Sequence, residues 1–191
     1  MDYPLFPFNP GWPSKLLDLE TARTRLKQIK AMMDERIELI TEVMGVYEDM
    51  RAIYDGELRF DVEVIADLDK WFFGRIVSLK DGVIDMDLRG RGDNPMPRGP
   101  VYNITPLAES ICIDTGLLFA KVVTHCCKEY KWTVVNRKRS PPGIVIVNPR
   151  SNHEYSPWEV MFGSIVMTVE HGQCCQLLYS YASSLEMPPL K

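Results

Sequence analysis

The stretch that decides the fold class is KWTVVNRKRSPPGIVIV, at residues 131–147. Its two ends, 131–136 and 144–147, are short runs rich in β-branched residues, which favour strands. The basic segment 137–143 between them contains two prolines and a glycine and predicts a turn, so the two strands should pair as an antiparallel hairpin. Helical patterns dominate the rest of the chain, and these residues therefore make the protein α+β rather than all-helical.

Helical patterns flank this hairpin on both sides. Before it, Leu107–Tyr130 carries apolar residues at the spacing of a buried helix. After a loop, Ser156 at the N-cap, Pro157 at the first helical position and Glu159 two residues later predict the start of another helix. A last helix is expected over 173–185.

A long helix is expected in the N-terminal half. Apolar residues recur every seven positions from Leu19 to Tyr54, which is the spacing of a coiled-coil stripe. Basic residues come early along this helix and acidic residues late, so an antiparallel pair of such helices would be electrostatically matched. The stripe therefore permits a structural homodimer built on this helix, and packing inside one subunit explains it equally well.

The remaining segments complete a single-domain layout. Residues 1–13 are rich in aromatic residues and proline, and we expect an extended arm packed on the domain or on a partner. Residues 14–191 are expected to form one α+β domain, mostly helical, with a small antiparallel hairpin flanked by helices. Its expected parts are the long helix (14–56), a second helical region with a short strand at its end (57–88), a loop (89–103) and a helix–hairpin–helix–helix half (104–187).

Composition narrows the classes of protein that fit. The chain has 191 residues and a formal net charge of −4, which argues against a nucleic-acid binder or a polybasic membrane protein. No apolar run is long enough to span a bilayer, and the first residues lack the features of a signal peptide. The five cysteines are an odd number and include two adjacent pairs, unlike a secreted disulfide framework. These features predict a cytoplasmic protein with reduced thiols.

The C-terminal half resembles a group of small bacterial proteins. The resemblance runs from TGLLFAKVV at residues 115–123, through YKW at 130–132 and the hairpin, to the helix that starts with SPW at 156–158. Several proteins with this pattern are similar to immunity proteins, which neutralise polymorphic or contact-delivered toxins. The resemblance implies a toxin inhibitor, and it assigns no functional residue.

The leading hypothesis is a non-enzymatic, immunity-type interaction module that binds a protein partner, a toxin or effector domain, through an acidic surface. Acidic side chains outnumber basic ones in residues 1–97, and the reverse holds in residues 98–191. An acidic surface would steer a basic partner toward the protein. The expected contact residues combine acidic side chains with two aromatic anchors. They are Tyr54, Glu57, Asp61, Glu63, Asp67, Asp69 and Trp71.

The alternative is a site built from cysteine and histidine. His125 and Cys126 fall on one expected helix, and His171 and Cys174 lie close together further along, so packed helices would offer a two-histidine, two-cysteine zinc site. Cys174, near a helix start, would also suit a nucleophile with His171 as its base in a hydrolase-like enzyme. Neither pair has the spacing of an established motif. We therefore predict no cofactor and no catalytic residue, and cysteines packed in the core are the simpler interpretation.

Overall fold

The computed structural model describes residues 3–11, 17–44, 64, 68, 84–87, 101–138 and 140–171. The described residues form helices and two small antiparallel sheets, which confirms the predicted α+β class. Within them, no helix combines the length and the apolar character needed to cross a membrane.

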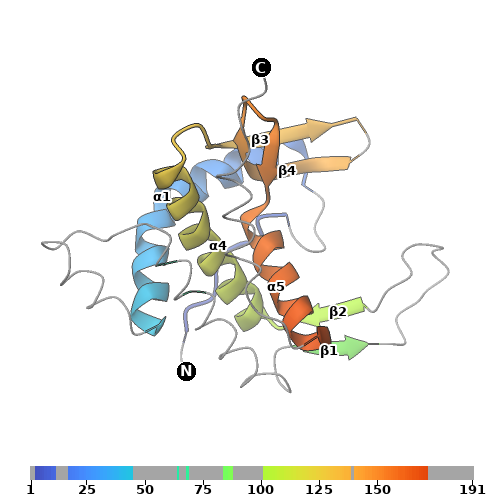
Figure 1. The fold of residues 1–191 in the computed structure, drawn as a ribbon. Helices are drawn as coiled ribbons and strands as arrows, with labels where there is room; N and C mark the ends of the chain where they lie inside the picture. The colour runs from blue at the N-terminus through green and yellow to red at the C-terminus, as the bar shows by residue number, and fades with distance from the viewer. Residues whose placement is uncertain are drawn as a thin grey trace, which may run out of the picture.

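Helices α1 (Leu19–Met44) and α4 (Pro106–Cys126) are the longest of the described elements. Asp18 caps α1 by accepting a hydrogen bond from the backbone N–H of Thr21 at 2.8 Å. Thr105 caps α4 in the same way, and Pro106 takes the first helical position, where its missing N–H costs nothing. Figure 1 shows α4 between α1 and α5 (Pro157–His171), so α4 is the central element.

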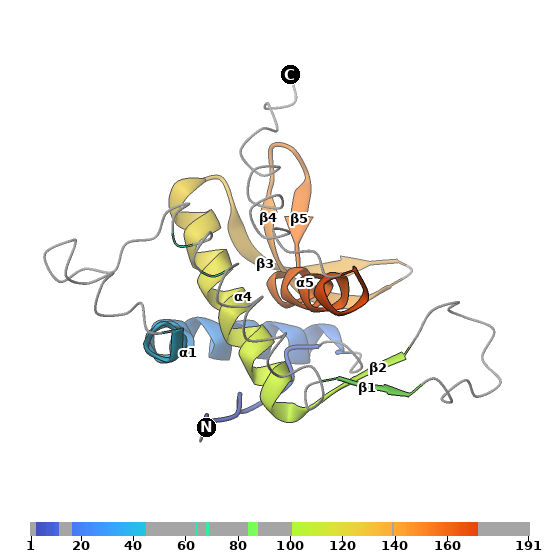
Figure 2. The same cartoon turned by 60° about the horizontal axis from the view of Figure 1, so that its bottom comes forward.

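The larger sheet confirms the predicted hairpin and adds a strand to it, but the second strand begins at Ser140, so residues 140–143 are strand and not part of the predicted turn. β3 (Lys131–Arg137), β4 (Ser140–Asn148) and β5 (His153–Tyr155) pair antiparallel in the order β3-β4-β5, as Figure 2 shows. β5 lies in a segment expected to be loop. Three residues carry too little pattern to signal a strand, and β5 forms because the edge of β4 offers backbone partners to it.

The second sheet corrects the expected loop over 89–103. β1 (Ile84–Asp87) pairs antiparallel with β2 (Val101–Ile104), so residues 101–103 are strand and not loop. Of the expected second helical region, the structure also describes Val64 and Leu68, which are helical and buried. The rest of that region, and the last helix expected over 173–185, lie outside the described residues.

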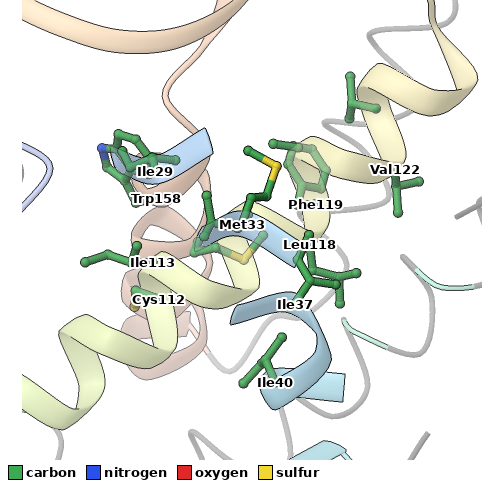
Figure 3. Packing of buried hydrophobic residues seen from close by; sticks show 14 of the residues in the cluster. Ile29, Met33, Ile37, Ile40, Cys112, Ile113, Leu118, Phe119, Val122 and Trp158 are labelled. Atoms are coloured by element: carbon green, nitrogen blue, oxygen red, sulfur yellow. The ribbon is translucent and has the colours of Figure 1, made fainter. Parts of the chain in front are cut away.

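The core is built between α1, α4 and the start of α5. Figure 3 shows Ile29, Met33, Ile37 and Ile40 of α1 close to the apolar side chains of α4, and all four are buried. Met33 and Ile40 belong to the seven-residue stripe. These two residues of the stripe therefore pack in the subunit's own core, and Leu26 packs against that core partly buried. The homodimer built on this helix stays a prediction.

An extended arm, residues 3–11, lies against α1 and α4. Tyr3 and Phe6 are buried, and the backbone N–H of Phe6 donates to Ser110 Oγ at 2.8 Å. The Arg25 guanidinium lies 4.4 Å from the centre of the Phe8 ring, a cation–π contact. The prolines of the arm keep it extended, and its aromatic rings fix it to the helices.

Candidate functional site

A groove of about 400 Å³ opens where α1, the last turns of α4 and the start of β3 meet. β3 begins only a few residues after α4 ends, and α1 packs against both elements, so three parts of the chain contribute side chains. We call this feature the lysine groove. Its lining residues are Lys30, Met33, Asp34, Lys121, Thr124, His125, Lys128 and Trp132.

Positive charge dominates the lysine groove. Lys30 and Lys128 are exposed, and Lys121 Nζ lies 2.9 Å from Asp34 Oδ1. The Lys121 side chain is 32% exposed and the Asp34 side chain is 81% exposed. Water therefore screens this ion pair, and either residue can exchange its partner for another charged group. With three lysines against one carboxylate, the groove carries a net positive charge that a ligand can reach.

An aromatic side chain gives the groove a firm apolar wall. Trp132 is half-buried, and its ring is stacked on Trp158 with the centroids 6.1 Å apart. Trp158 is itself buried beside Gly116 of α4, where an added Cβ would lie 3.0 Å from the carbonyl carbon of Pro157. Because the backbones of α4 and α5 approach closely there, Trp158 behind Trp132 has little room to move.

A second polar cluster lies beneath the arm. Arg36 forms a two-pronged ion pair with Asp114, through Nε at 2.9 Å from Oδ1 and through Nη2 to Oδ2. The Tyr3 hydroxyl donates to Asp114 Oδ2 at 2.5 Å, and Arg36 Nη2 also donates to the carbonyl oxygen of Pro4 at 3.0 Å. We call these residues the arm cluster. Both oxygens of its carboxylate have donors, so the cluster joins the arm to α1 and α4.

Burial and charge oppose each other in the arm cluster. Burial raises the pKa of Asp114, while the hydrogen bonds and charge of Arg36 and the Tyr3 hydroxyl act to lower it. Burial lowers the pKa of Arg36, but the hydrogen bonds and charge of Asp114, together with the charges of Tyr3 and Glu35, raise it by more in total, so the guanidinium stays charged. Burial also raises the pKa of Tyr3 far above its ordinary value, which keeps its hydroxyl a donor. The arrangement suits a structural role.

A tyrosine–histidine pair joins the start of β3 to β5. Tyr130 Oη lies 2.7 Å from His153 Nδ1, and the His153 ring centre lies 4.4 Å from that of Tyr155. Burial lowers the pKa of His153, which keeps its ring neutral at pH 7 and able to accept a hydrogen bond. Sequence reasoning missed this pair because His153 fell in an expected loop.

Of the four cysteine and histidine candidates, the structure describes His125, Cys126 and the backbone of His171. His125 and Cys126 are exposed in the last turn of α4, and His171 is the last residue of α5. In Figures 1 and 2 the C-terminal ends of these two helices lie apart. Cys174 lies outside the described residues. Among those described, no group of three or more histidine, cysteine or acidic residues could hold a metal ion.

Two further thiols are unsuited to nucleophilic chemistry. Cys112 and Cys127 are buried, and burial raises the pKa of each thiol, so both remain protonated at neutral pH. They serve as small apolar residues, as the simpler interpretation predicts for core cysteines.

The contact residues of the leading hypothesis, both acidic and aromatic, lie outside the part of the chain that the structure describes. These are Tyr54, Glu57, Asp61, Glu63, Asp67, Asp69 and Trp71. The sequence placed Lys128 and Trp132 near the basic residues 137–139, as a possible contact for phosphate or an acidic partner. It did not indicate the lysine groove, because Lys30 lies far from Lys121 and Lys128 in the chain and no local motif connects the three.

The resemblance to immunity proteins finds no support in wider comparison. The chain matches no protein-family model, no curated protein and no solved structure.

Proposed function

We propose that this protein is an interaction module that acts by binding a partner protein, with the lysine groove as one of its contact sites. The observation that supports this proposal is the convergence of Lys30, Lys121 and Lys128 around the half-buried ring of Trp132. Clustered charge steers a partner of opposite charge and fixes its orientation, and a buried aromatic ring supplies apolar contact area.

The acidic surface of the leading hypothesis is a second proposed contact site. On α1, the side chains of Glu35, Glu38 and Glu42 are exposed, so acidic charge also lies on the described part of the chain. An inhibitor of the immunity type is the finer form of this proposal. It is supported by the sequence pattern over 115–158.

The test compares two variants with the same change of net charge. In the groove variant, the lysines of the groove are reversed: Lys30→Glu, Lys121→Glu and Lys128→Glu. In the control variant, exposed basic residues outside the groove are reversed: Arg23→Glu, Lys27→Glu and Lys138→Glu. Each tagged chain is used to capture partners from its native cells, and the retained proteins are quantified by mass spectrometry.

We expect one protein to be retained in stoichiometric amount by the wild type and by the control variant, and to be lost from the groove variant. Retention of the same protein by both variants would remove the groove as a contact site. Recovery of the wild type without any other retained protein, from cells grown under conditions in which its partners are expressed, would contradict the interaction module itself.

A further inference from the structure

We propose that the lysine groove binds an acidic peptide segment of the partner, with carboxylates a few residues apart and an apolar side chain between them. This inference rests on the proposed function and names the chemistry of the occupant. It follows from the origin of the lysines in different parts of the chain, the apolar side chains that line the same groove and the groups in the groove that disfavour a phosphate.

The origin of the positive charge suits an extended segment. Lys121 lies on α4, whereas Lys128 follows Cys127, the C-cap of α4, and lies in the turn before β3. Lys30 adds a charge from α1. A single phosphate places all of its charge at one point. An extended chain holds carboxylates three residues apart at about 10 Å, so it can offer them separately to lysines from different parts of the chain.

The apolar part of the groove lies among these charges. Met33 of α1 and Trp132 of β3 line the same groove as the lysines, and Trp132 is held in place by its stacking on Trp158. A leucine or aromatic side chain between the two carboxylates would bury against this surface. Rigid aromatic side chains of this kind are common anchors at protein interfaces.

The groups beside the lysines disfavour a phosphate or a nucleotide. Asp34 is 81% exposed within the groove, and it would repel a dianion more strongly than a single carboxylate. The groove also lies at the C-terminal end of α4, whose partial negative charge opposes a dianion more strongly than a single carboxylate. The groove is open rather than enclosed, unlike most pockets for small molecules.

The experiment follows the amide signals of the full-length chain, and the indole N–H signal of Trp132, by NMR during titration with defined probes. The main probe is an acidic dodecapeptide that repeats Glu-Glu-Leu. Its neutral counterpart repeats Gln-Gln-Leu, and ATP and inorganic phosphate represent the other anions. Wild type, groove variant and control variant are titrated under identical salt, and their unliganded spectra establish that each is folded. If the groove variant is unfolded, Lys→Gln replacements at the same positions take its place.

We expect the acidic peptide to shift the Trp132 indole signal and the amides of the groove in the wild type and the control variant. Its affinity should fall by about tenfold or more in the groove variant, since several attractive charges become repulsive. Equal binding of the neutral peptide would overturn the inference, and so would equal binding of the acidic peptide to both variants.

Two further outcomes separate this inference from the proposed function. If ATP or phosphate shifts the groove signals and the acidic peptide does not, the occupant is wrong while the groove remains an anion-binding contact site. If no probe shifts these signals, the acidic-peptide inference fails. The capture experiment then decides independently whether the protein is an interaction module, by the retention of a partner on the wild type and its loss from the groove variant.

Discussion

Two ion pairs join α1 to α4, with their charges reversed and their surroundings opposite. Arg36 on α1 pairs with Asp114 on α4, and the two side chains are 8% and 0% exposed. Only two residues earlier on α1, Asp34 pairs with Lys121 on α4, and these side chains are 81% and 32% exposed. The same two helices therefore present one ion pair to the interior and one to water.

Burial determines what each pair can contribute. Removing Arg36 and Asp114 from water is costly, and the two-pronged contact, the Tyr3 hydroxyl and the Pro4 carbonyl offset that cost. Removal of either partner leaves a buried group without its counter-charge, which is strongly destabilising. Water already solvates Asp34 and Lys121, so their pairing contributes little and Lys121 can accept a new anion. The buried pair stabilises the fold, and the second pair is weak enough to rearrange when an anion binds Lys121.

The largest difference should appear when one carboxylate of each pair is neutralised. Asp114→Asn leaves the Arg36 guanidinium buried without a counter-charge, and we expect the free energy of unfolding to fall by about 3–5 kcal/mol. Asp34→Asn is the matched control and should change it by less than about 0.5 kcal/mol. Urea denaturation measures both. Equal losses in the two variants would show that burial does not separate the pairs.

A substitution in the arm tests the same cluster, because Tyr3 contacts Asp114 from the arm. Tyr3→Phe removes the hydroxyl that donates to Asp114 and keeps the ring, so we expect a loss of about 1.5–3 kcal/mol, the range for hydrogen bonds to charged groups. Leu5→Ala is the control within the arm, because Leu5 is 54% exposed. A loss in Tyr3→Phe no larger than in Leu5→Ala would mean that the hydroxyl does not stabilise the buried pair.

Gly116 lies on α4 between Asp114 and Lys121, and there the constraint is steric. A Cβ at this position would meet Pro157 and Trp158 backbone atoms at 3.0 to 3.2 Å, so Gly116→Ala should cost about 1–3 kcal/mol by forcing α5 away. The control is Gly143→Ala in β4, where the nearest atom, Val135 Cγ2, is 3.8 Å away. Thermal unfolding should separate the two, with the melting temperature of the control close to that of the wild type.

The contrast between local and long-range signals explains what the sequence predicted. The β-branched runs at 131–136 and 144–147 and the capped start at Pro157 carry their signals within a few residues, and both predictions are confirmed. β2 and β5 are too short for a readable pattern, and they form through pairing with other strands. Secondary structure was therefore predicted best where the residues of one short segment carry the whole signal.

The polar sites depend on residues that are distant in the chain. Arg36 and Asp114 are 78 positions apart, and the groove takes residues from α1, α4 and β3. One signal for the buried pair was present. Arg36 follows Ile29 and Met33 and precedes Ile40 at the spacing of the buried stripe, which places a charge on an apolar face. A charge there requires a buried partner, but the helix pattern alone does not identify which residue provides it.

A smaller effect should distinguish the Tyr130–His153 pair from both ion pairs, because it depends on pH. Burial lowers the pKa of folded His153 below its ordinary value of 6.5. Its contribution to stability is therefore complete above pH 6.5 and is lost as the pH falls through the folded pKa. The free energy of unfolding of the wild type should decline more steeply below pH 6.5 than that of His153→Gln, as measured by urea denaturation across that range. Parallel declines would contradict the role of His153.

The smallest expected effect is the coupling between Asp34 and Lys121. In a double-mutant cycle of Asp34→Asn and Lys121→Gln, we expect an interaction free energy below about 0.5 kcal/mol that falls further with added salt. The same cycle on Arg36 and Asp114 should give several times more. A weak coupling matters for binding, because an incoming carboxylate then gains Lys121 without breaking a strong contact. A coupling as large as that of the buried pair would mean that Lys121 is committed to Asp34, and the groove would lose one of its three cations as a site for an acidic ligand.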